Sequence, residues 1–412
     1  GRQRLDELMP LVLNAAASGA QSLNVLKSIC GLLESVAGRT TYLSLLVENP
    51  VALSQLSQLC AASSWLAALL SSHPILLDEL LDPRALYDPL DKAGLQEVLD
   101  VQLAGLPSDD LEQQMDQLRQ FKLASVLHVA ATDIVTGLPV AGVGDYLTFI
   151  AEVVLEKVMQ LAWNHLVERH GLPGYMLHGK LREAQFGIVA YGKLGGRELG
   201  YGSDLDIVFL HDSCGNEQHT AGPKVLDNSE FFTRLSQRII HFLNTYTSAG
   251  ILYEVDMRLR PNGASGLLVS SLEAFAEYQS SSAWTWENQA LVRARVVAGG
   301  KEIVRQFEQV RSGVLARSRA AGKLRQEVLD MRQRMRDEMD RSNAGQVDLK
   351  HCRGGIVDIE FMVQCGTLLW SDKHTEILGY TDTLRLLEAF ARAGLMPDED
   401  ARQLADCLLY TS

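Results

Sequence analysis

The sequence predicts an α+β protein in which a small mixed sheet is flanked by all-helical regions. Three observations predict this class: Leu and Ala recur at helical spacing early in the chain, short β-branched and aromatic runs follow, and charged amphipathic stretches return near the end. We therefore expect a helical linker or scaffold over residues 1–120, an α/β domain over 121–300, and a truncated C-terminal helical domain over 301–412.

Composition limits the possible partners. The chain has 412 residues, enough for two or three domains with hydrophobic cores. No stretch approaches the roughly 18 consecutive apolar residues that a membrane span needs. The net charge of −13 argues against nucleic-acid binding, which favours a basic surface. We expect neither membrane nor nucleic acid as a partner, whereas a small anion could bind at a local cluster of positive charge.

Cysteine usage and the chain ends predict the cellular setting. The six cysteines are scattered and form no C-x-x-C pair, which predicts reduced thiols in a cytoplasmic protein and no zinc site. The N-terminus enters a helical pattern directly, so we expect no secretory signal. Because the chain lacks an initiator Met and stops abruptly at "DCLLYTS", we expect a piece of a longer protein.

Pro, Gly and Asp mark the expected helix ends in the first region. Breaks are predicted at "SSHPILL", "LDPRALYDPLD" and "GLPSDD". Nothing catalytic stands out there, which favours a scaffold or linker. The next element is a long amphipathic helix, "GDYLTFIAEVVLEKVMQLAWNHLVERHG", with Asp145 as its N-cap and Gly171 as its C-terminal stop.

Three β-like runs follow: "FGIVAYG", "LDIVFLH" and "GILYEVDMRLRP". A helix-like stretch, "SEFFTRLSQRIIHFLNTY", separates the second run from the third. Later helices are predicted in "GKLRQEVLDMRQRMRDEMDR", "GGIVDIEFMVQCGTLLW" and "TDTLRLLEAFARAGLM". This order of elements predicts a helical, α/β, helical organisation.

The first strand leads into a glycine-rich turn. Residues 187–194 differ from the P-loop pattern G-x-x-x-x-G-K-[ST] in the last position, where Leu194 offers no hydroxyl for Mg²⁺. Residues 188–191 also suit a strand, whereas a P-loop needs them in a loop. We therefore interpret "GKLGGREL" as a turn that opens a short helix.

This turn is a candidate phosphate site. Gly195 and Gly196 carry no Cβ, so a phosphate could approach their backbone, and unpaired N–H groups at a helix start favour an anion. Lys193 and Arg197 could add positive charge. A plain tight turn is the alternative, and it would be preferred if the following residues were ordinary.

Asp204 and Asp206 stand two residues apart at the start of the second strand. On a strand this spacing places both carboxylates on one face, about 6.5 to 7 Å apart. Two carboxylates so close repel each other unless a cation lies between them, and Mg²⁺ binds through a few carboxylates plus substrate phosphates. The pattern alone is common: Asp398 and Asp400 have the same spacing in a predicted polar turn. The apolar run after Asp206 distinguishes Asp204 and Asp206 from that second pair.

A third carboxylate lies in "ILYEVDMRLRP", which alternates strictly. One face would carry Ile251, Tyr253, Val255, Met257 and Leu259, and the other Glu254, Asp256, Arg258 and Arg260. If this strand lies beside Asp204 and Asp206, Asp256 completes a triad able to hold two metal ions about 3.5 to 4 Å apart. Arg258 and Arg260 could then bind triphosphate oxygens. Alternatively, the arginines only pair with the acids beside them.

Two further stretches are open to more than one interpretation. "AWTWENQALVRARVV" starts a helix whose Arg293 and Arg295 could face the site or only stabilise the domain. "RGGIVDIEF" places two glycines before a helix, with Asp358 and Glu360 early in it. Because the helix dipole alone favours acids there, a structural role is favoured.

Four long segments stand in order along the chain: "VAYGKLGGRELGYGSDLDIVFLHD", "GILYEVDMRLRPNGASGLLV", "AWTWENQALVRARVV" and "GGIVDIEFMVQ". The Gly-Gly turn, the Asp-x-Asp strand and the later acidic strand resemble the nucleotidyltransferase fold of the DNA polymerase β type. Together the four segments resemble bacterial glutamine synthetase adenylyltransferase, over roughly residues 120 to 400. The resemblance implies that 121–300 is a polymerase-β-like nucleotidyltransferase domain.

That enzyme has two similar halves. One removes AMP from a tyrosine of glutamine synthetase by phosphorolysis, and the C-terminal one attaches it. "YGKLGGRELGYGSDLD" and "WTWENQALVRARV" look more like the attaching half, and the preceding helices fit the linker between halves. The resemblance implies a cytoplasmic transferase in nitrogen metabolism, with ATP as substrate, glutamine synthetase and the PII signalling protein as partners, and glutamine as an effector.

The resemblance also implies roles for individual residues. Asp204 and Asp206 would bind Mg²⁺ or Mn²⁺, and Asp256 would bind the second metal and help to deprotonate the tyrosine. The nucleotide-binding set is Gly195, Gly196, Ser203, Lys193, Arg258 and Arg260. The tyrosine oxygen would attack the α-phosphorus in line, with pyrophosphate leaving and no covalent enzyme intermediate.

Three other interpretations stay open. The chain could be the deadenylylating half of the same enzyme. It could be a metal-dependent glycosyltransferase that uses Asp-x-Asp with a nucleotide sugar, although the "GKLGG" turn gives that no support. It could also be a non-catalytic regulatory module whose helices bind a partner.

Overall fold

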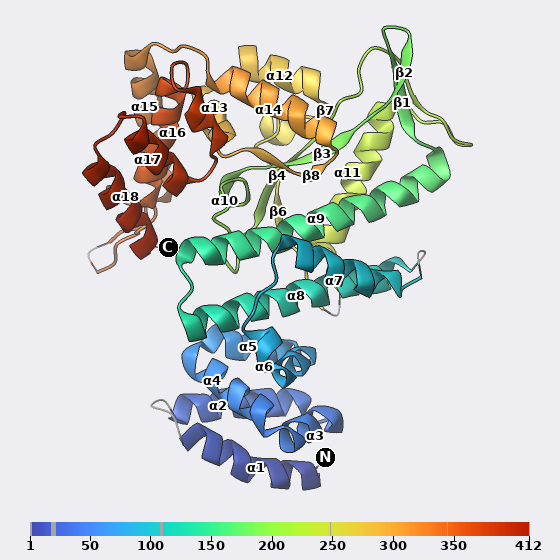
Figure 1. Ribbon diagram of the computed structural model, residues 1–412, viewed down its shortest axis with the longest axis vertical. Coiled ribbons are helices and arrows are strands. Elements are labelled where there is room, and N and C mark those ends of the chain that lie inside the picture. The colour runs from blue at the N-terminus through green and yellow to red at the C-terminus, as the bar shows by residue number, and fades with distance from the viewer. Residues whose placement is uncertain (1, 18–21, 108–109, 248, 344, 412) are drawn as a thin grey trace. The chain divides into compact units, whose positions relative to one another are not determined.

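The protein forms two compact units. The computed structural model describes residues 2–17, 22–107, 110–247, 249–343 and 345–411. Unit 1 comprises Gly1–Ile150 and Tyr246–Leu252, and unit 2 comprises Ala151–Thr245 and Tyr253–Ser412. Figure 1 labels the helices and strands of both.

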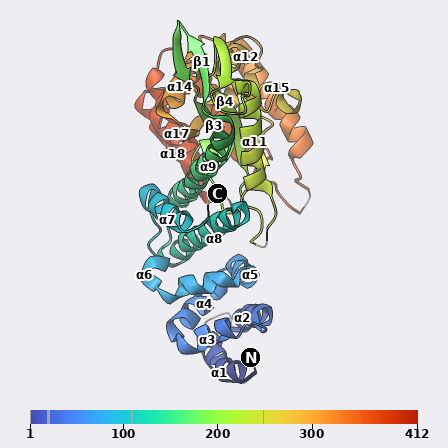
Figure 2. The same ribbon diagram turned by 90° about the vertical axis from the view of Figure 1, so that its right-hand side faces the viewer.

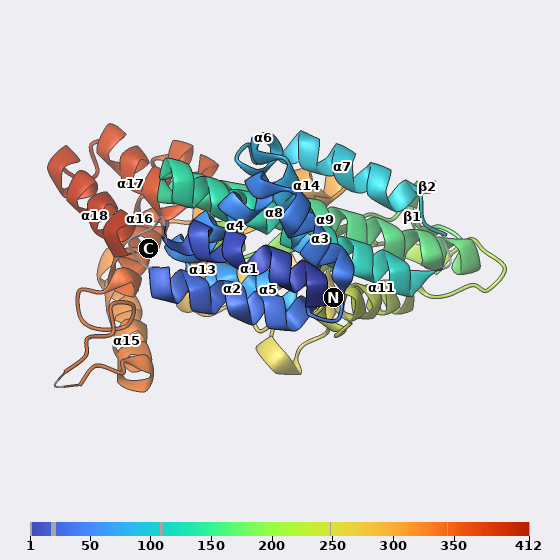
Figure 3. The same ribbon diagram turned by 90° about the horizontal axis from the view of Figure 1, so that it is seen from below.

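Helices form unit 1. Its first five helices pack against one another through buried Leu, Val and Ala side chains (Figure 3). Asp82, Asp91 and Asp110 each accept a backbone N–H at the start of the helix that follows, which confirms the predicted breaks in "LDPRALYDPLD" and "GLPSDD". The break predicted in "SSHPILL" is confirmed by the helix end at Ser72. The elements are α1 (Arg2–Ala17), α2 (Ser22–Val36), α3 (Thr40–Glu48), α4 (Pro50–Ala62), α5 (Ser64–Ser72), η1 (Pro74–Leu81), α6 (Pro83–Leu86), α7 (Lys92–Ala104), α8 (Leu111–Thr136) and the first part of α9 (Val140–His170).

Two buried cations of α8 hold the segment Tyr246–Leu252 in unit 1. Arg119 Nε donates to the carbonyl of Gly250 at 2.7 Å, and Lys122 Nζ donates to that of Leu252 at 2.6 Å. Burial, and then the nearby charge of Arg119, lowers the pKa of Lys122 to about 8. This segment is therefore fixed by side chains of a helix rather than by pairing in a sheet.

The long helix α9 begins earlier than predicted. Because it starts at Val140, Asp145 lies inside the helix and is not its N-cap. Gly142 and Gly144 weaken helix formation ahead of Asp145 but do not stop it. The predicted C-terminal stop is confirmed, since Gly171 follows the last helical residue with a φ of +77°.

Unit 2 contains every strand of the described residues. Its elements after α9 are β1 (Pro173–Leu177), β2 (Lys180–Glu183), β3 (Phe186–Ala190), α10 (Gly192–Gly195), β4 (Leu205–His211), β5 (Asn216–Thr220), α11 (Asn228–Asn244), β6 (Val255–Asp256), η2 (Gly263–Ser265), β7 (Val269–Ser271), α12 (Leu272–Ser281), α13 (Thr285–Val292), β8 (Arg295–Gly299), α14 (Lys301–Leu315), α15 (Ala321–Met339), α16 (Ile356–Trp370), η3 (Thr375–Gly379), α17 (Thr383–Arg392) and α18 (Asp398–Thr411).

A mixed five-stranded sheet lies at the centre of unit 2. The strand order is β6-β4-β3-β8, and β7 also pairs with β4. β3 is antiparallel to β4 and β8, whereas β6 and β7 are parallel to the start and the end of β4. β1, β2 and β5 form a separate antiparallel sheet. The predicted strands around β3 and β4, and the α+β class with a small mixed sheet, are confirmed.

The two faces of the central sheet pack against different helices. Phe186 of β3 stacks on Phe209 of β4 and on Phe232 of α11, with ring centroids 5.7 and 5.8 Å apart, and Figure 2 shows α11 lying along the sheet. Val189 and Val208 on the opposite face belong to an apolar cluster with α12, α13 and α14. Helices therefore exclude water from both faces.

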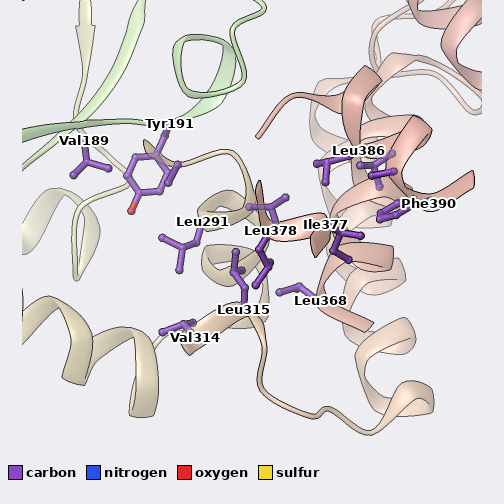
Figure 4. Close-up of a cluster of buried hydrophobic side chains, with 14 of the residues drawn as sticks. Val189, Tyr191, Leu291, Val314, Leu315, Leu368, Ile377, Leu378, Leu386 and Phe390 are labelled. Carbon is purple, nitrogen blue, oxygen red and sulfur yellow. The ribbon is translucent and has the colours of Figure 1, made fainter. Parts of the chain in front are cut away.

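The C-terminal helices share this second core. Figure 4 shows Tyr191, which follows β3, in the same cluster as Leu291, Leu378 and Phe390. The predicted helices α15, α16 and α17 are confirmed. Asp398 begins α18, so Asp398 and its neighbours lie in a first helical turn instead of the predicted polar turn, where the helix dipole favours acids.

The predicted region boundaries fall at different kinds of position. Residue 120 lies inside α8, which has no Pro or Gly to interrupt it, whereas residue 300 falls between β8 and α14. The assignment of 1–120, 121–300 and 301–412 as domains stays a prediction.

None of the described helices is long and apolar enough to cross a membrane. All six cysteines are free in the structure, and their reduced state in the cell stays a prediction.

Gly171→Ala should destabilise the protein more than Gly179→Ala. Both glycines have positive φ, but a Cβ at Gly171 would lie 2.4 Å from the nitrogen of Gly222, whereas one at Gly179 meets nothing within 4 Å. We expect a loss of about 1 kcal/mol for Gly179→Ala and about 3 kcal/mol for Gly171→Ala, measured by urea unfolding. Equal losses would contradict the predicted clash.

His211 should make stability fall in acid. Burial lowers its pKa to about 4, and its ring stacks on Phe232 at 4.6 Å. Because the folded-state pKa lies below the unfolded value near 6.5, its contribution is complete above that value and is lost as the pH falls. Between pH 7 and pH 5, urea unfolding of the unaltered chain should lose about 2 kcal/mol more than His211→Phe, which keeps the stacking. Parallel pH profiles would argue against this.

Candidate active site

β4 and β6 bring the three predicted acids together. Asp206 of β4 lies opposite Asp256 of β6 in a parallel register, and Asp204 comes immediately before β4. The Leu205 N–H donates to the carbonyl of Glu254 at 2.9 Å and extends this pairing. Acids from two distant parts of the chain therefore meet at the start of β4.

The strand that carries Asp256 is much shorter than predicted. Residues 250–261 were expected to form one alternating strand, but β6 contains only Val255 and Asp256. Leu252 and Tyr253 are buried in succession, which breaks the alternation. The strand ends after Asp256 because the Asp256 carboxylate accepts the backbone N–H of Arg258 at 2.8 Å, and this hydrogen bond turns the chain.

Burial and charge repulsion together raise the pKa of Asp206 to about 6. Burial is the main cause, followed by the negative charges of Asp204 and Asp256, while Arg293 and Arg258 act in the opposite direction. The two neighbouring acids are therefore close enough to affect the ionisation of Asp206. Such a group favours a nearby cation.

Arg258 is the cation that pairs with Asp256 in this structure. Its guanidinium donates to both carboxylate oxygens, and these hydrogen bonds lower the pKa of Asp256. The Arg258 side chain is 82% exposed, so water competes for it. Within the described part of the chain, no three His, Cys, Asp or Glu side chains are already placed to hold a metal ion.

Gly192 has a structural role at this site that sequence reasoning missed. It has a φ of +53°, and a Cβ there would lie 2.1 Å from Oδ2 of Asp206. The backbone N–H of Tyr191 donates to the carbonyl of Asp206 at 2.8 Å. The first glycine of "GKLGG" therefore lets the turn lie directly against this carboxylate, and its place in the motif was the available signal.

Gly195 and Gly196 face Arg293. A Cβ on Gly195 would lie 1.8 Å from the Arg293 carbonyl oxygen, and one on Gly196 would lie 2.6 Å from its guanidinium. Their N–H groups donate to the carbonyls of Tyr191 and Gly192, and so close the turn. Their lack of side chains therefore serves packing, and their predicted contact with a phosphate stays a prediction.

The other predicted nucleotide-binding residues differ in how exposed their side chains are and in how many hydrogen bonds they make within the protein. Lys193 is exposed. Ser203 lies next to Asp204, and its hydroxyl accepts the Gly200 N–H at 3.0 Å. Arg260 donates to three backbone carbonyls of its own loop, which holds that loop closed. The structure thus leaves Lys193 and Arg258 more accessible to a ligand than Arg260.

The open question about Arg293 and Arg295 has a structural answer. Arg293 is buried and pairs with Glu198 and Glu360. Burial disfavours its charge, yet the two carboxylates raise the pKa of Arg293 above its usual value. Arg295 pairs with buried Glu152 and donates to the backbone of the glycine turn. Both arginines stabilise unit 2, and no local sequence signal identified their partners.

The fold and the site together define an α+β protein with an acidic centre at the start of an inner strand of a mixed sheet. Residues 53–310, more than half of the chain, match the family model for glutamate-ammonia ligase adenylyltransferase. The chain belongs to this family. Residues 322–410, within the C-terminal helices, match the model for GlnD PII-uridylyltransferase.

Similar proteins named bifunctional glutamine synthetase adenylyltransferase/adenylyl-removing enzyme occur in several bacteria. Those of Thioalkalivibrio sulfidiphilus, Nitrosococcus oceani and Hahella chejuensis are 56%, 52% and 49% identical to this sequence, each over 98% of the chain. The matched part makes up 42% of each of these relatives. The chain therefore spans about two fifths of their length, and the predicted resemblance is confirmed for the family.

Asp206→Asn should stabilise the protein in the absence of divalent cations. At pH 7.5 the change removes a half-buried charge repelled by two neighbours, so we expect a gain of about 1 to 3 kcal/mol in urea unfolding with EDTA present. Asp204→Asn removes one of the two repelling charges from an exposed position, so it should stabilise the protein by a smaller amount than Asp206→Asn. A loss of stability in Asp206→Asn would contradict the repulsion.

Proposed function

We propose that this chain is a metal-dependent nucleotidyltransferase that moves AMP from ATP to a tyrosine hydroxyl of glutamine synthetase, and thereby regulates nitrogen metabolism. The observation that carries the proposal is the parallel register that sets Asp206 beside Asp256, with Asp204 one residue before the strand. The names of the relatives, which refer to adenylyl transfer on glutamine synthetase, support the choice of group and acceptor.

The fold proposed for this part of unit 2 is that of a polymerase-β-like nucleotidyltransferase. Three features support it: the glycine turn after β3, the Asp-x-Asp pair at the start of antiparallel β4, and the third acid on parallel β6. This arrangement places the turn and the acids on the same end of the sheet, because β3 ends where β4 begins.

The three carboxylates have the donor chemistry of a divalent-cation site. Oxygen ligands suit Mg²⁺ and Mn²⁺, and the raised pKa of Asp206 reflects negative charge that a cation would relieve. Asp204, Asp206 and Asp256 would hold the metal ions. When bound, these ions neutralise the charge that develops on the phosphoryl oxygens.

The residues of the chain would position and activate the reactants. The tyrosine oxygen forms a bond to the α-phosphorus, the bond to the bridging oxygen of the β-phosphate breaks, and pyrophosphate leaves. Asp256 takes the phenolic proton once Arg258 has left its carboxylate. Arg258 and Lys193, both exposed, then neutralise the triphosphate, with Ser203 beside them.

We propose that the chain corresponds to the attaching half of the longer relatives. The "YGKLGGRELGYGSDLD" and "WTWENQALVRARV" stretches support this choice. A cytoplasmic location, the PII signalling protein as a partner and glutamine as an effector belong to the same proposal. The match of residues 322–410 to a PII-uridylyltransferase model agrees with a link to PII signalling. The deadenylylating half is the second candidate.

A transfer assay with radiolabelled ATP tests the proposal. With Mg²⁺, glutamine synthetase should gain label from the α-phosphate and none from the γ-phosphate. Asp206→Asn should reduce the rate at least about a hundredfold. Asp398→Asn is the matched control, because Asp398 has the same Asp-x-Asp spacing in α18 and should leave the rate unchanged.

The rival function predicts a different product. The deadenylylating half would release ADP from adenylylated glutamine synthetase when phosphate is added, without any ATP. Unchanged labelling in Asp206→Asn, or labelling that survives EDTA, would rule out the proposed carboxylate mechanism. If ADP is released and no AMP is transferred, the second candidate replaces the first.

A further inference from the structure

An ionic cluster of three residues, centred on buried Arg293, contacts the glycine turn of unit 2. Arg293, at the end of α13, pairs with Glu198 after the turn and with Glu360 of α16. The Arg293 side chain is only 7% exposed, and its bond to Glu360 measures 2.6 Å. Removing one partner of such a pair leaves a buried charge uncompensated. The cluster therefore holds the end of α13, the residues after the turn and α16 together.

The turn is also tied directly to the start of α17. The hydroxyl of Thr381 donates to the carbonyl of Gly195 at 2.8 Å. The Thr383 N–H donates to Glu198 at 2.8 Å, so one carboxylate contacts both Arg293 and the first turn of α17. Two of the C-terminal helices therefore hold the turn through polar contacts.

Apolar packing supports the same connection. Tyr191, the residue before the turn, is fully buried in a cluster that includes Leu378, Leu386 and Phe390 of the C-terminal segment (Figure 4). Gly192 then brings the turn against the Asp206 carboxylate. A displacement of α16 or α17 would thus be transmitted through close-packed groups to the residue that contacts this acid.

We propose that Arg293 and Glu360 are positioning residues through which the C-terminal helices set the placement of the turn at residues 192–197, and hence the geometry around Asp206. The inference rests on the proposed function and adds a role for the segment 321–412. Neither residue acts on the substrate. Their contribution is to hold the turn in the one arrangement in which Gly192 accommodates the carboxylate.

If Glu360 only stabilised α16, another ion pair of this helix should affect AMP transfer and exchange at the turn to the same extent. Asp358 offers the comparison. It lies two residues from Glu360 and pairs with buried Arg332 and with Arg336, with no contact to the turn among its described hydrogen bonds. Both pairs support α16, but only Glu360 reaches Arg293.

The test compares Glu360→Gln with Asp358→Asn in the whole chain. Hydrogen exchange of the amides of Gly195, Gly196 and Glu198 reports on the turn, because their N–H groups close it. In Glu360→Gln we expect exchange at these amides to rise at least about tenfold, and kcat for AMP transfer to fall about ten- to a hundredfold, with the KM for ATP changing less than about threefold. Asp358→Asn should leave all three values within about twofold.

Partial recovery of kcat in Glu360→Asp would further support the positioning role, since it restores the charge. Equal effects of Glu360→Gln and Asp358→Asn, or normal exchange at the turn in Glu360→Gln, would overturn it. If Glu360→Gln does not fold, Glu360→Asp decides, because it keeps the charge but shortens the side chain that reaches Arg293. Faster exchange at the turn would then support the positioning role, and unchanged exchange would overturn it. If the unaltered chain transfers no AMP, the proposed function fails, and exchange at the turn still tests the connection.

Discussion

The crowding of three carboxylates at the start of β4 is the constraint on which the rest of unit 2 depends. Asp206 and Asp256 face each other across a pairing that is only two residues long, so the sheet alone provides few hydrogen bonds to oppose their repulsion. The flanking segments supply the rest. The Tyr253 N–H donates to the carbonyl of Leu243 in α11 at 3.1 Å, and Arg260 closes the loop that follows Asp256. The acids stay together because their backbone is fixed from both sides.

Two arginines near the acids differ in burial, and this difference separates their roles. Arg258 is 82% exposed and pairs with the neighbouring Asp256, so its bond is weak enough to exchange for another anion. Arg293 is buried between two carboxylates, where loss of one partner is costly and exchange for a ligand is unfavourable. The first is suited to meeting a substrate, and the second to holding the protein in shape. From the sequence, Arg258 was expected to bind triphosphate oxygens, whereas the role of Arg293 was left open between the site and the stability of the domain.

Local patterns were sufficient to predict most elements of the fold. Apolar periodicity predicted the helices of both ends and the strands β3 and β4, and these are confirmed. The predicted strand around Asp256 was too long because alternation cannot reveal that α8 captures the preceding segment. The predicted N-cap of α9 was wrong because the helix begins at Val140 and continues through Gly142 and Gly144 to Asp145. Glu198 and Glu360 were missed as partners, since contacts with Arg293 span long stretches of chain.

The glycines of the "GKLGG" motif show why a motif can locate a site while its obvious explanation is incomplete. Gly192 makes room for the Asp206 carboxylate, whereas Gly195 and Gly196 make room for the backbone and guanidinium of Arg293. All three positions exclude a Cβ, but each does so against a group of the protein. The glycines of the motif therefore allow the turn to lie close to Asp206 on one side and close to Arg293 on the other. Any phosphate bound here would meet a turn whose shape is already set by those two contacts, so its position would depend on the arginine as much as on the acid.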